Sequence, residues 1–300
     1  MLSSAKVETR LLVGITRARV ARLQPGARNG VTGSAFVNSL PKSGTNLLLK
    51  LMKSLRGMQL VELRLGQRKT GAYRPRAGEP SIPAGIALPA EMSLRRLART
   101  VGRLPAGSYF WGHMPYSRAF SELLAASHVK MVLIVRDPRD VVVSSAAYLA
   151  SRPGHRLSAS FRPLTEEERV LASISGLPDQ DGRPGLRSIG ERVASIVPWM
   201  SEPFVYVTRF EHLVGPAGGG SEYAQIEEVR NITAHVGRPL PDEEVRHLAA
   251  GLFGGTPTFR NGKIGAWREV FTERHVAAAK PLLDDLLVEL GYETTSAWPS

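Results

Sequence analysis

Two short segments of the chain combine residue types that suit the binding of phosphate groups. Residues 40–46 read Leu-Pro-Lys-Ser-Gly-Thr-Asn, with a lysine, two hydroxyl side chains and a glycine that lets the backbone approach an anion closely. Residues 136–145 read Arg-Asp-Pro-Arg-Asp-Val-Val-Val-Ser-Ser. There Arg136 offers a forked guanidinium and Ser144 a hydroxyl. Both segments therefore predict contacts with the oxygens of a phosphate-bearing ligand, and Arg139 and Asp140 are expected to form a helix-start ion pair or cap.

Two further segments could contribute to the same chemistry. His113, in Trp-Gly-His-Met-Pro, can take a proton from an alcohol or phenol near neutral pH. An isolated histidine is more often a hydrogen-bonded structural residue, so its place in the fold decides between the two roles. Residues 259–268 form a basic turn with an Asn-Gly pair, followed by Trp267.

The elements around these segments predict how they are positioned. Residues 40–46 lie between an apolar strand at 34–38 and a helix with apolar residues at helical spacing over 47–55. His113 closes a strand at 108–111, and Arg136 closes the most apolar run, 129–135. A run that is apolar on both faces suits a central parallel strand. Further elements are a strand at 203–208 and helices at 138–151, 165–174, 190–200, 221–236, 242–251 and 273–290.

This alternation of strands and helices predicts an α/β fold, a single three-layer domain with a central parallel sheet flanked by helices. Ligands of such sheets bind at the carboxyl ends of the strands, where the candidate segments lie. We expect residues 1–33 to be a basic N-terminal extension and residues 34–300 to be the domain. Residues 60–90, rich in Gly, Pro and Arg, predict a long loop or flap.

Composition limits the classes of function. The 300 residues carry a net charge of +12, which predicts anionic partners such as nucleic acid, a membrane surface or a multiply charged small molecule. The chain has no cysteine, which excludes a disulfide scaffold, a thiol nucleophile and a cysteine zinc site. No apolar run is long enough for a membrane span. The arginine-rich extension can be interpreted as a membrane-surface helix, a transit peptide or, as we favour, a solvated arm.

Pro-Lys-Ser-Gly-Thr between a strand and a helix resembles the 5′-phosphosulfate loop of the sulfotransferases, which use 3′-phosphoadenosine 5′-phosphosulfate (PAPS). The resemblance spans about residues 34–290 and implies a P-loop NTPase-like fold. By this resemblance the donor is bound by Lys42, Ser43, Gly44, Thr45 and Asn46. It also implies that Arg136 and Ser144 hold the 3′-phosphate of the donor.

The same resemblance assigns the remaining site residues. His113 matches the general base of the family, which lies between the two phosphate motifs with a proline two residues later. Residues 259–268 resemble the basic glycine-containing loop that closes over the 3′-phosphate, and the corresponding contacts are Arg260, Asn261 and Gly262. Lys42 is implied to stabilise charge on the leaving phosphate, and no metal is implied.

Three positions depart from the family pattern. Leu47 stands where an aromatic residue commonly stacks on adenine, Trp111 where a lysine is often found, and Phe210 where the family has a tyrosine. The way in which adenine is held is therefore left open.

The implied function is transfer of a sulfuryl group from PAPS to a hydroxyl or amine of a small-molecule, lipid or glycan acceptor. The implied protein is cytoplasmic and has no nucleic-acid partner, and a homodimer stays open. One alternative is a P-loop kinase with Asp137 on Mg²⁺, although the lysine of residues 40–46 precedes its glycine, whereas a Walker A lysine follows it. The other is a non-enzymatic polyanion-binding protein, although no zinc-finger, RNA-recognition or basic-zipper signature is present.

Overall fold

The structure is a computed structural model that describes residues 33–65, 73–180, 185–255, 262–296 and 298. The N-terminal extension, apart from its last residue, therefore lies outside the described residues, and so do Arg260 and Asn261. Within the described part of the chain, no helix is long and apolar enough to cross a bilayer.

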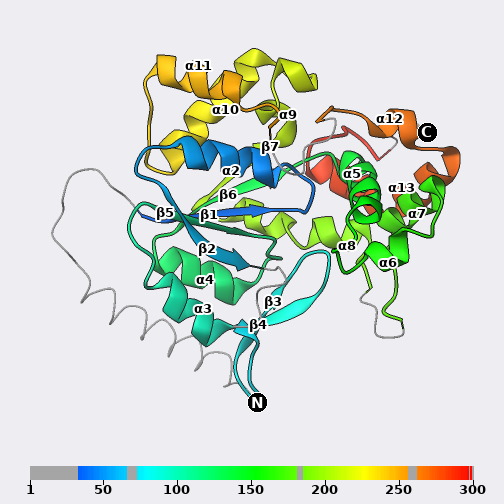
Figure 1. The fold of residues 1–300 in the computed structure, drawn as a ribbon, viewed down its shortest axis with the longest axis horizontal. Coiled ribbons are helices and arrows are strands. Elements are labelled where there is room, and N and C mark those ends of the chain that lie inside the picture. Colours follow the sequence, from blue (N-terminus) through cyan, green and yellow to red (C-terminus); the bar gives the residue numbers. More distant parts are fainter. Residues whose placement is uncertain (1–32, 66–72, 181–184, 256–261, 297, 299–300) are drawn as a thin grey trace.

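A five-stranded parallel sheet forms the centre of the fold, as expected from the sequence (Figure 1). In spatial order its strands are β2 (Gln59–Leu65), β5 (Ser108–Gly112), β1 (Ala35–Ser39), β6 (Lys130–Val135) and β7 (Val205–Arg209). The two middle strands, β1 and β6, are almost wholly buried, because helices cover both faces of the sheet.

Helices cover the two faces of the sheet and form separate apolar cores with it. One face is covered by α2 (Thr45–Ser54), α9 (Phe210–Leu213), α10 (Glu222–His235) and α11 (Asp242–Gly251). The other is covered by α3 (Leu94–Val101), α4 (Arg118–Ala126) and α8 (Ile189–Ala194). This is the predicted three-layer arrangement.

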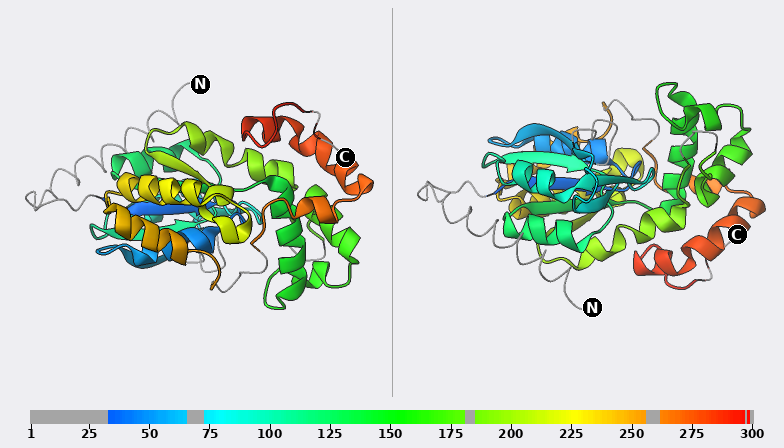
Figure 2. Two further views of the ribbon diagram at one scale, coloured as in Figure 1. Left: turned by 90° about the horizontal axis from the view of Figure 1, so that it is seen from above. Right: turned by 90° about the horizontal axis from the view of Figure 1, so that it is seen from below.

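A second group of helices gathers at one end of the molecule, beyond the sheet (Figure 2). Its members are α5 (Pro138–Ser151), α6 (Ser158–Phe161), α7 (Glu166–Ser175), α12 (Trp267–Val270) and α13 (Glu273–Glu289). Because α5 begins directly after β6, this group lies against the carboxyl ends of the strands, where the candidate segments are.

The prediction of a long loop over residues 60–90 is wrong for the described part of that segment. β2 extends the sheet at its edge, and β3 (Ser81–Ala84) and β4 (Ala90–Ser93) form an antiparallel hairpin. Ile82 and Ala84 are buried while their neighbours in β3 are exposed, which is the alternation of a half-buried strand. Short strands with this pattern are hard to recognise among glycines, prolines and charged residues.

The helix expected at 190–200 is divided in two. α8 ends at Ala194, and a 3-10 turn, η2 (Val197–Ser201), follows it. Pro198 lies in this turn and has no backbone N–H to continue an α-helix.

Candidate phosphate-binding site

The loop between β1 and α2 is built to expose backbone N–H groups. Gly44 immediately precedes α2 with a left-handed φ of 102° and makes no side-chain cap, and Lys42 has a φ of 76°. A Cβ atom at Gly44 would lie 2.8 Å from the ring of Phe210, so this position requires glycine in both conformation and space. The first N–H groups of α2 therefore open into the loop as an anion site would require.

Ser43 gives independent support for a ligand at this loop. Its side chain is fully buried, and among the described residues its Oγ atom has no hydrogen-bond partner. A buried hydroxyl without a partner costs free energy unless a ligand or water supplies one. The loop therefore fits a ligand that brings acceptor oxygens.

Lys42 extends from this loop toward α5. Its Nζ atom lies 4.1 Å from the centroid of the Tyr148 ring, within the range of a cation–π contact. Tyr148 also packs against a third apolar cluster, whose buried members include Leu149 and Phe161. The lysine thus lies at the boundary between the phosphate-binding loop and an apolar region.

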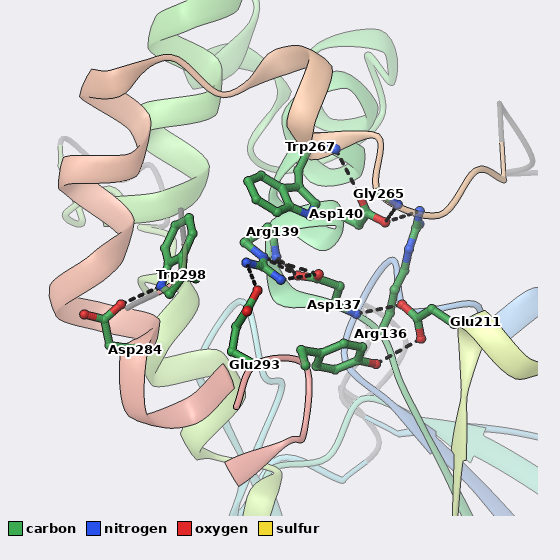
Figure 3. Close-up of polar contacts among 11 residues, drawn as sticks. Arg136, Asp137, Arg139, Asp140, Glu211, Gly265, Trp267, Asp284, Glu293 and Trp298 are labelled. Atoms are coloured by element: carbon green, nitrogen blue, oxygen red, sulfur yellow. Dashed lines mark hydrogen bonds and ion pairs between the residues drawn. The ribbon is translucent and has the colours of Figure 1, made fainter. Parts of the chain in front are cut away.

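Arg136, at the end of β6, is buried beside the same loop (Figure 3). Its Nη2 atom donates a hydrogen bond of 2.8 Å to the carbonyl of Lys263 and lies 3.5 Å from Asp140. Its guanidinium stacks 4.2 Å from the centroid of the Phe210 ring, while Nε is buried and has no partner among the described residues. Phe210 therefore supports the arginine from one side and Gly44 packs on the same ring.

Asp140 fastens the C-terminal loop to the start of α5. One carboxylate oxygen accepts a hydrogen bond of 2.9 Å from the backbone N–H of Gly265, and the other accepts one of 3.0 Å from that of Trp267 (Figure 3). Burial raises the pKa of Asp140, whereas Arg136 and these two N–H groups favour the charged form. The loop expected to close over a phosphate is thus held beside Arg136.

The start of α5 differs from the expectation that Arg139 and Asp140 form an ion pair or cap. Asp137 is the residue that caps α5, and it forms the ion pair with Arg139 at 2.8 Å. Asp140 instead points to the C-terminal loop, because the first turn of α5 faces residues 265–267.

Arg139 is the centre of a buried cluster next to the site. It is 1% exposed and packs against the rings of both Trp267, at 4.1 Å, and Trp298, at 5.0 Å, which also contact each other. Both carboxylate oxygens of Asp137 accept hydrogen bonds from it, and Glu293 accepts another at 2.5 Å (Figure 3). The last described residues of the chain are thereby joined to the start of α5.

His113 follows β5 and is half-buried at the carboxyl edge of the sheet. Its Nδ1 atom lies 2.8 Å from the carbonyl oxygen of Ser39, at the end of the neighbouring strand β1. Burial lowers the pKa of His113 to about 4; the bond to Ser39 opposes this shift and the positive charge of Lys42 adds to it. The ring is thus neutral at pH 7 and can accept a proton.

We expect His113 to titrate near pH 4 in the folded chain. An unfolded histidine has a pKa near 6.5, so the unfolded state binds more protons between these values. This group therefore makes the free energy of unfolding rise with pH up to about 6.5 and contributes nothing further above it. An NMR titration of the imidazole measures the pKa, and a midpoint near 6.5 would contradict the environment described here.

The structure brings most of the predicted residues together. The carbonyl of Lys42 lies 3.5 Å from Nη1 of Arg136, and residues 262–265 lie beside that arginine. Ser144 is half-buried in α5, two turns beyond Arg136, and Asn46 lies in the first turn of α2. The sequence interpretation missed the contact of Asp140 with the C-terminal loop, because the two segments lie far apart in the chain.

Comparison with known proteins agrees with this geometry. A family model described as the sulfotransferase domain matches residues 33–158, which include both the loop at 40–46 and the segment at 136–145. A curated relative, a flavonol sulfotransferase-like protein of Flaveria bidentis, is 26% identical over 190 residues. That alignment covers 60% of this chain and 60% of the relative.

Solved structures share the fold. A mouse sulfotransferase, SULT7A1, complexed with PAP, is 18% identical, covers 92% of this chain and 89% of its own, and superposes with a TM-score of 0.57. Retinol dehydratase in complex with androsterone and the inactive cofactor PAP is 16% identical, covers 85% and 80% of the two chains, and gives a TM-score of 0.51. Residues 33–158 therefore match the sulfotransferase domain, and the chain shares the fold of a solved sulfotransferase.

Proposed function

We propose that the protein transfers a sulfuryl group from PAPS to a hydroxyl or amine of an acceptor. The observation that carries this proposal is a pair of anion-binding sites at the ends of the adjacent strands β1 and β6. The first has the N–H groups of the loop after β1 and the unpartnered hydroxyl of Ser43, and the second has the buried Arg136 after β6. A donor with phosphate groups at its 5′ and 3′ positions needs two such sites. The proteins of similar fold were solved with PAP, the product nucleotide 3′-phosphoadenosine 5′-phosphate.

Each predicted residue has a role in this proposal. Lys42, Ser43, Gly44, Thr45 and Asn46 bind the 5′-phosphosulfate. Arg136 and Ser144 bind the 3′-phosphate, and Arg260, Asn261 and Gly262 close over it. Residues 34–300 act as one domain, and the protein works in the cytoplasm.

The proposed reaction is a direct in-line transfer. A new bond forms between the acceptor oxygen or nitrogen and sulfur, while the bond between sulfur and the bridging oxygen of the donor breaks and leaves PAP. His113 takes the proton of the acceptor, and Lys42 with the N–H groups of the loop stabilises the charge that develops on the bridging oxygen.

The third apolar cluster is proposed as one wall of the acceptor pocket. Its members come from the β3–β4 hairpin, α5, α6 and α7, and include Leu88, Leu149, Phe161 and Leu164. The hairpin is bonded to the proposed base, because the backbone N–H of Ile86 donates to the carbonyl of His113 at 3.2 Å. An acceptor whose hydroxyl is attached to an apolar body would suit these surroundings.

A P-loop kinase is not favoured. In that alternative Asp137 would hold Mg²⁺, but both of its carboxylate oxygens accept hydrogen bonds from Arg139. No contact in the described residues specifically favours a non-enzymatic polyanion-binding protein.

The function is tested by a screen of alcohols, phenols and amines with ³⁵S-labelled PAPS, followed by identification of the sulfated product. Calorimetry with PAP gives a second test that needs no acceptor. Tight PAP binding without turnover would mean that the correct acceptor is missing from the screen. Failure to bind PAP, together with hydrolysis of ATP that EDTA abolishes, would overturn the proposal.

Replacing Arg136 by alanine should weaken PAP binding by about tenfold or more, since hydrogen bonds to charged groups contribute roughly 1.5–3 kcal/mol. Arg136→Lys should restore only part of this affinity, because an ammonium cannot bind a phosphate in the forked manner of a guanidinium. Calorimetry measures both variants. The matched control is Arg118→Ala, which removes an arginine that is 87% exposed and pairs with Glu122; equal PAP affinity of Arg136→Ala and this control would exclude the role.

A further inference from the structure

We propose that Ser39 and Asn38, the last two residues of β1, are positioning residues that set the tautomer and orientation of His113. The inference rests on the proposed function, since it concerns the group that accepts the proton. It adds a hydrogen-bonded connection between this group and the phosphate-binding loop.

The register of the sheet places these residues together. β1 and β5 are parallel neighbours with Asn38 opposite Gly112, so Ser39 lies opposite His113. The side chain of Asn38 is fully buried and makes two hydrogen bonds to the backbone of Met114, the residue after His113. Its Oδ1 accepts from the N–H of Met114 at 2.8 Å, and its Nδ2 donates to the carbonyl of Met114 at 2.9 Å.

This double contact fixes the chain that carries His113. Only an amide can donate and accept in this way, because a carboxylate has no donor and an aliphatic side chain has neither group. The indole of Trp199 donates to the same carbonyl at 3.1 Å. The backbone next to His113 is therefore held by the buried side chains of Asn38 and Trp199, and this sets the position of the imidazole.

Ser39 determines which ring nitrogen carries the proton. Nδ1 of His113 lies 2.8 Å from the carbonyl oxygen of Ser39, which can only accept. In the neutral ring Nδ1 must therefore carry the hydrogen, which leaves the lone pair on Nε2. Nε2 is then the atom that takes the proton of the acceptor, and the same carbonyl stabilises the resulting imidazolium.

The hydroxyl of Ser39 continues this connection to α2. It lies 3.1 Å from Nδ1 and 2.6 Å from the hydroxyl of Thr45. Since Nδ1 already carries a hydrogen, the Ser39 hydroxyl donates to Thr45, the remaining partner that the described residues offer. Thr45 then keeps its own hydrogen for another acceptor, and it is the first residue of the helix that follows the phosphate-binding loop.

The hydrogen bonds are therefore donated in one direction, from His113 to Ser39, from Ser39 to Thr45, and from Thr45 to an oxygen of the bound donor. Charge that forms on the imidazole polarises each of these bonds in the same direction. The base and the donor loop are thereby coupled at the moment when the proton leaves the acceptor.

The tautomer can be tested without donor or acceptor. In protein labelled with ¹⁵N-histidine, the shifts of the two ring nitrogens report which one carries the hydrogen, and His113→Gln identifies the signal among those of the seven histidines. We expect Nδ1 to be protonated and Nε2 to be unprotonated at pH 7. A ring protonated on Nε2 would overturn the inference and leave the proposed function standing.

Kinetics then test the connection. Ser39→Ala should lower kcat by about three- to tenfold, the effect of one hydrogen bond, with unchanged PAP affinity. Ser39→Thr, which keeps the hydroxyl, should recover most of the loss. The matched control is Ser34→Ala. Ser34, just before β1, is hydrogen-bonded to the hydroxyl of Ser108 in β5 at 3.1 Å, at the end of these strands opposite to Ser39 and His113.

Comparison of Ser39→Ala with Ser34→Ala and with Ser39→Thr separates a positioning effect from a loss of stability. If Ser39→Ala and Ser34→Ala lose equal activity, or if Ser39→Thr recovers none, the hydroxyl does not act through His113 and the connection is refuted. Asn38→Asp, which removes the donor to Met114, should broaden or shift the His113 signal whether or not the chain turns over PAPS. An unaltered His113 signal in a folded Asn38→Asp variant would refute the role of Asn38.

Discussion

His113→Ala should reduce kcat by at least about a hundredfold, because a positioned general base typically contributes 10²–10⁴-fold to the rate. The affinity for PAP should stay within about twofold of the native value, since the hydrogen bonds that this side chain makes within the described residues are with Ser39 and not with Arg136 or Ser144. Initial rates with the best acceptor and calorimetry with PAP measure the two quantities separately.

A second histidine provides the control for this loss. His155 lies beside the third apolar cluster, where the centroid of its ring is 5.9 Å from that of Tyr148. Burial lowers the pKa of His155, as it does that of His113. His155→Ala should alter the KM of the acceptor more than kcat, because the cluster is proposed as a wall of the acceptor pocket. Retention of more than about a tenth of kcat by His113→Ala would remove this residue from the proton transfer.

Arg139→Ala should destabilise the fold by about 3–5 kcal/mol, the cost of removing one partner of a buried ion pair. The arginine is 1% exposed, and its loss leaves the buried Asp137 carboxylate without its ion pair and removes the cation–π contacts with Trp267 and Trp298. Urea denaturation measures the free energy of unfolding, and an unchanged m value would show that the unfolded state is the same.

Arg118→Ala is the matched control for this prediction as well. Arg118 pairs with Glu122 at 3.0 Å, but its side chain is 87% exposed, so its loss should change the free energy of unfolding by less than about 1 kcal/mol. A similarly small change for Arg139→Ala would mean that the cluster around it contributes little to stability.

Local sequence signals predicted much of this fold. The α5 helix has the expected bounds, because Asp137 caps it and Pro138 occupies its first turn, where the missing N–H has no cost. β6 is apolar on both faces, and β1 and β5 are short and mostly apolar, so the sequence predicts all three strands. The edge strand β2 and the β3–β4 hairpin were missed, since each buries only some of its residues.

The site was predicted less completely than the fold. The loops could be found from residues adjacent in sequence, as with Lys42, Ser43 and Gly44. The contact of Ser39 with His113 and that of Asp140 with Gly265 join residues 74 and 125 positions apart. Such contacts depend on strand order and on the path of the C-terminal segment, and no local periodicity reports either.

The junction made by Arg139 and Asp140 also has a consequence for biosynthesis. Both residues lie within the matched domain, but their partners, Gly265, Trp267, Glu293 and Trp298, are translated at least 125 residues later. The sheet can form before these partners are translated, because its last strand ends at Arg209, whereas the arginine beside the proposed 3′-phosphate site gains its support only once residues 265–298 have left the ribosome. A nascent chain halted before these residues should therefore fold in part and fail to retain nucleotide.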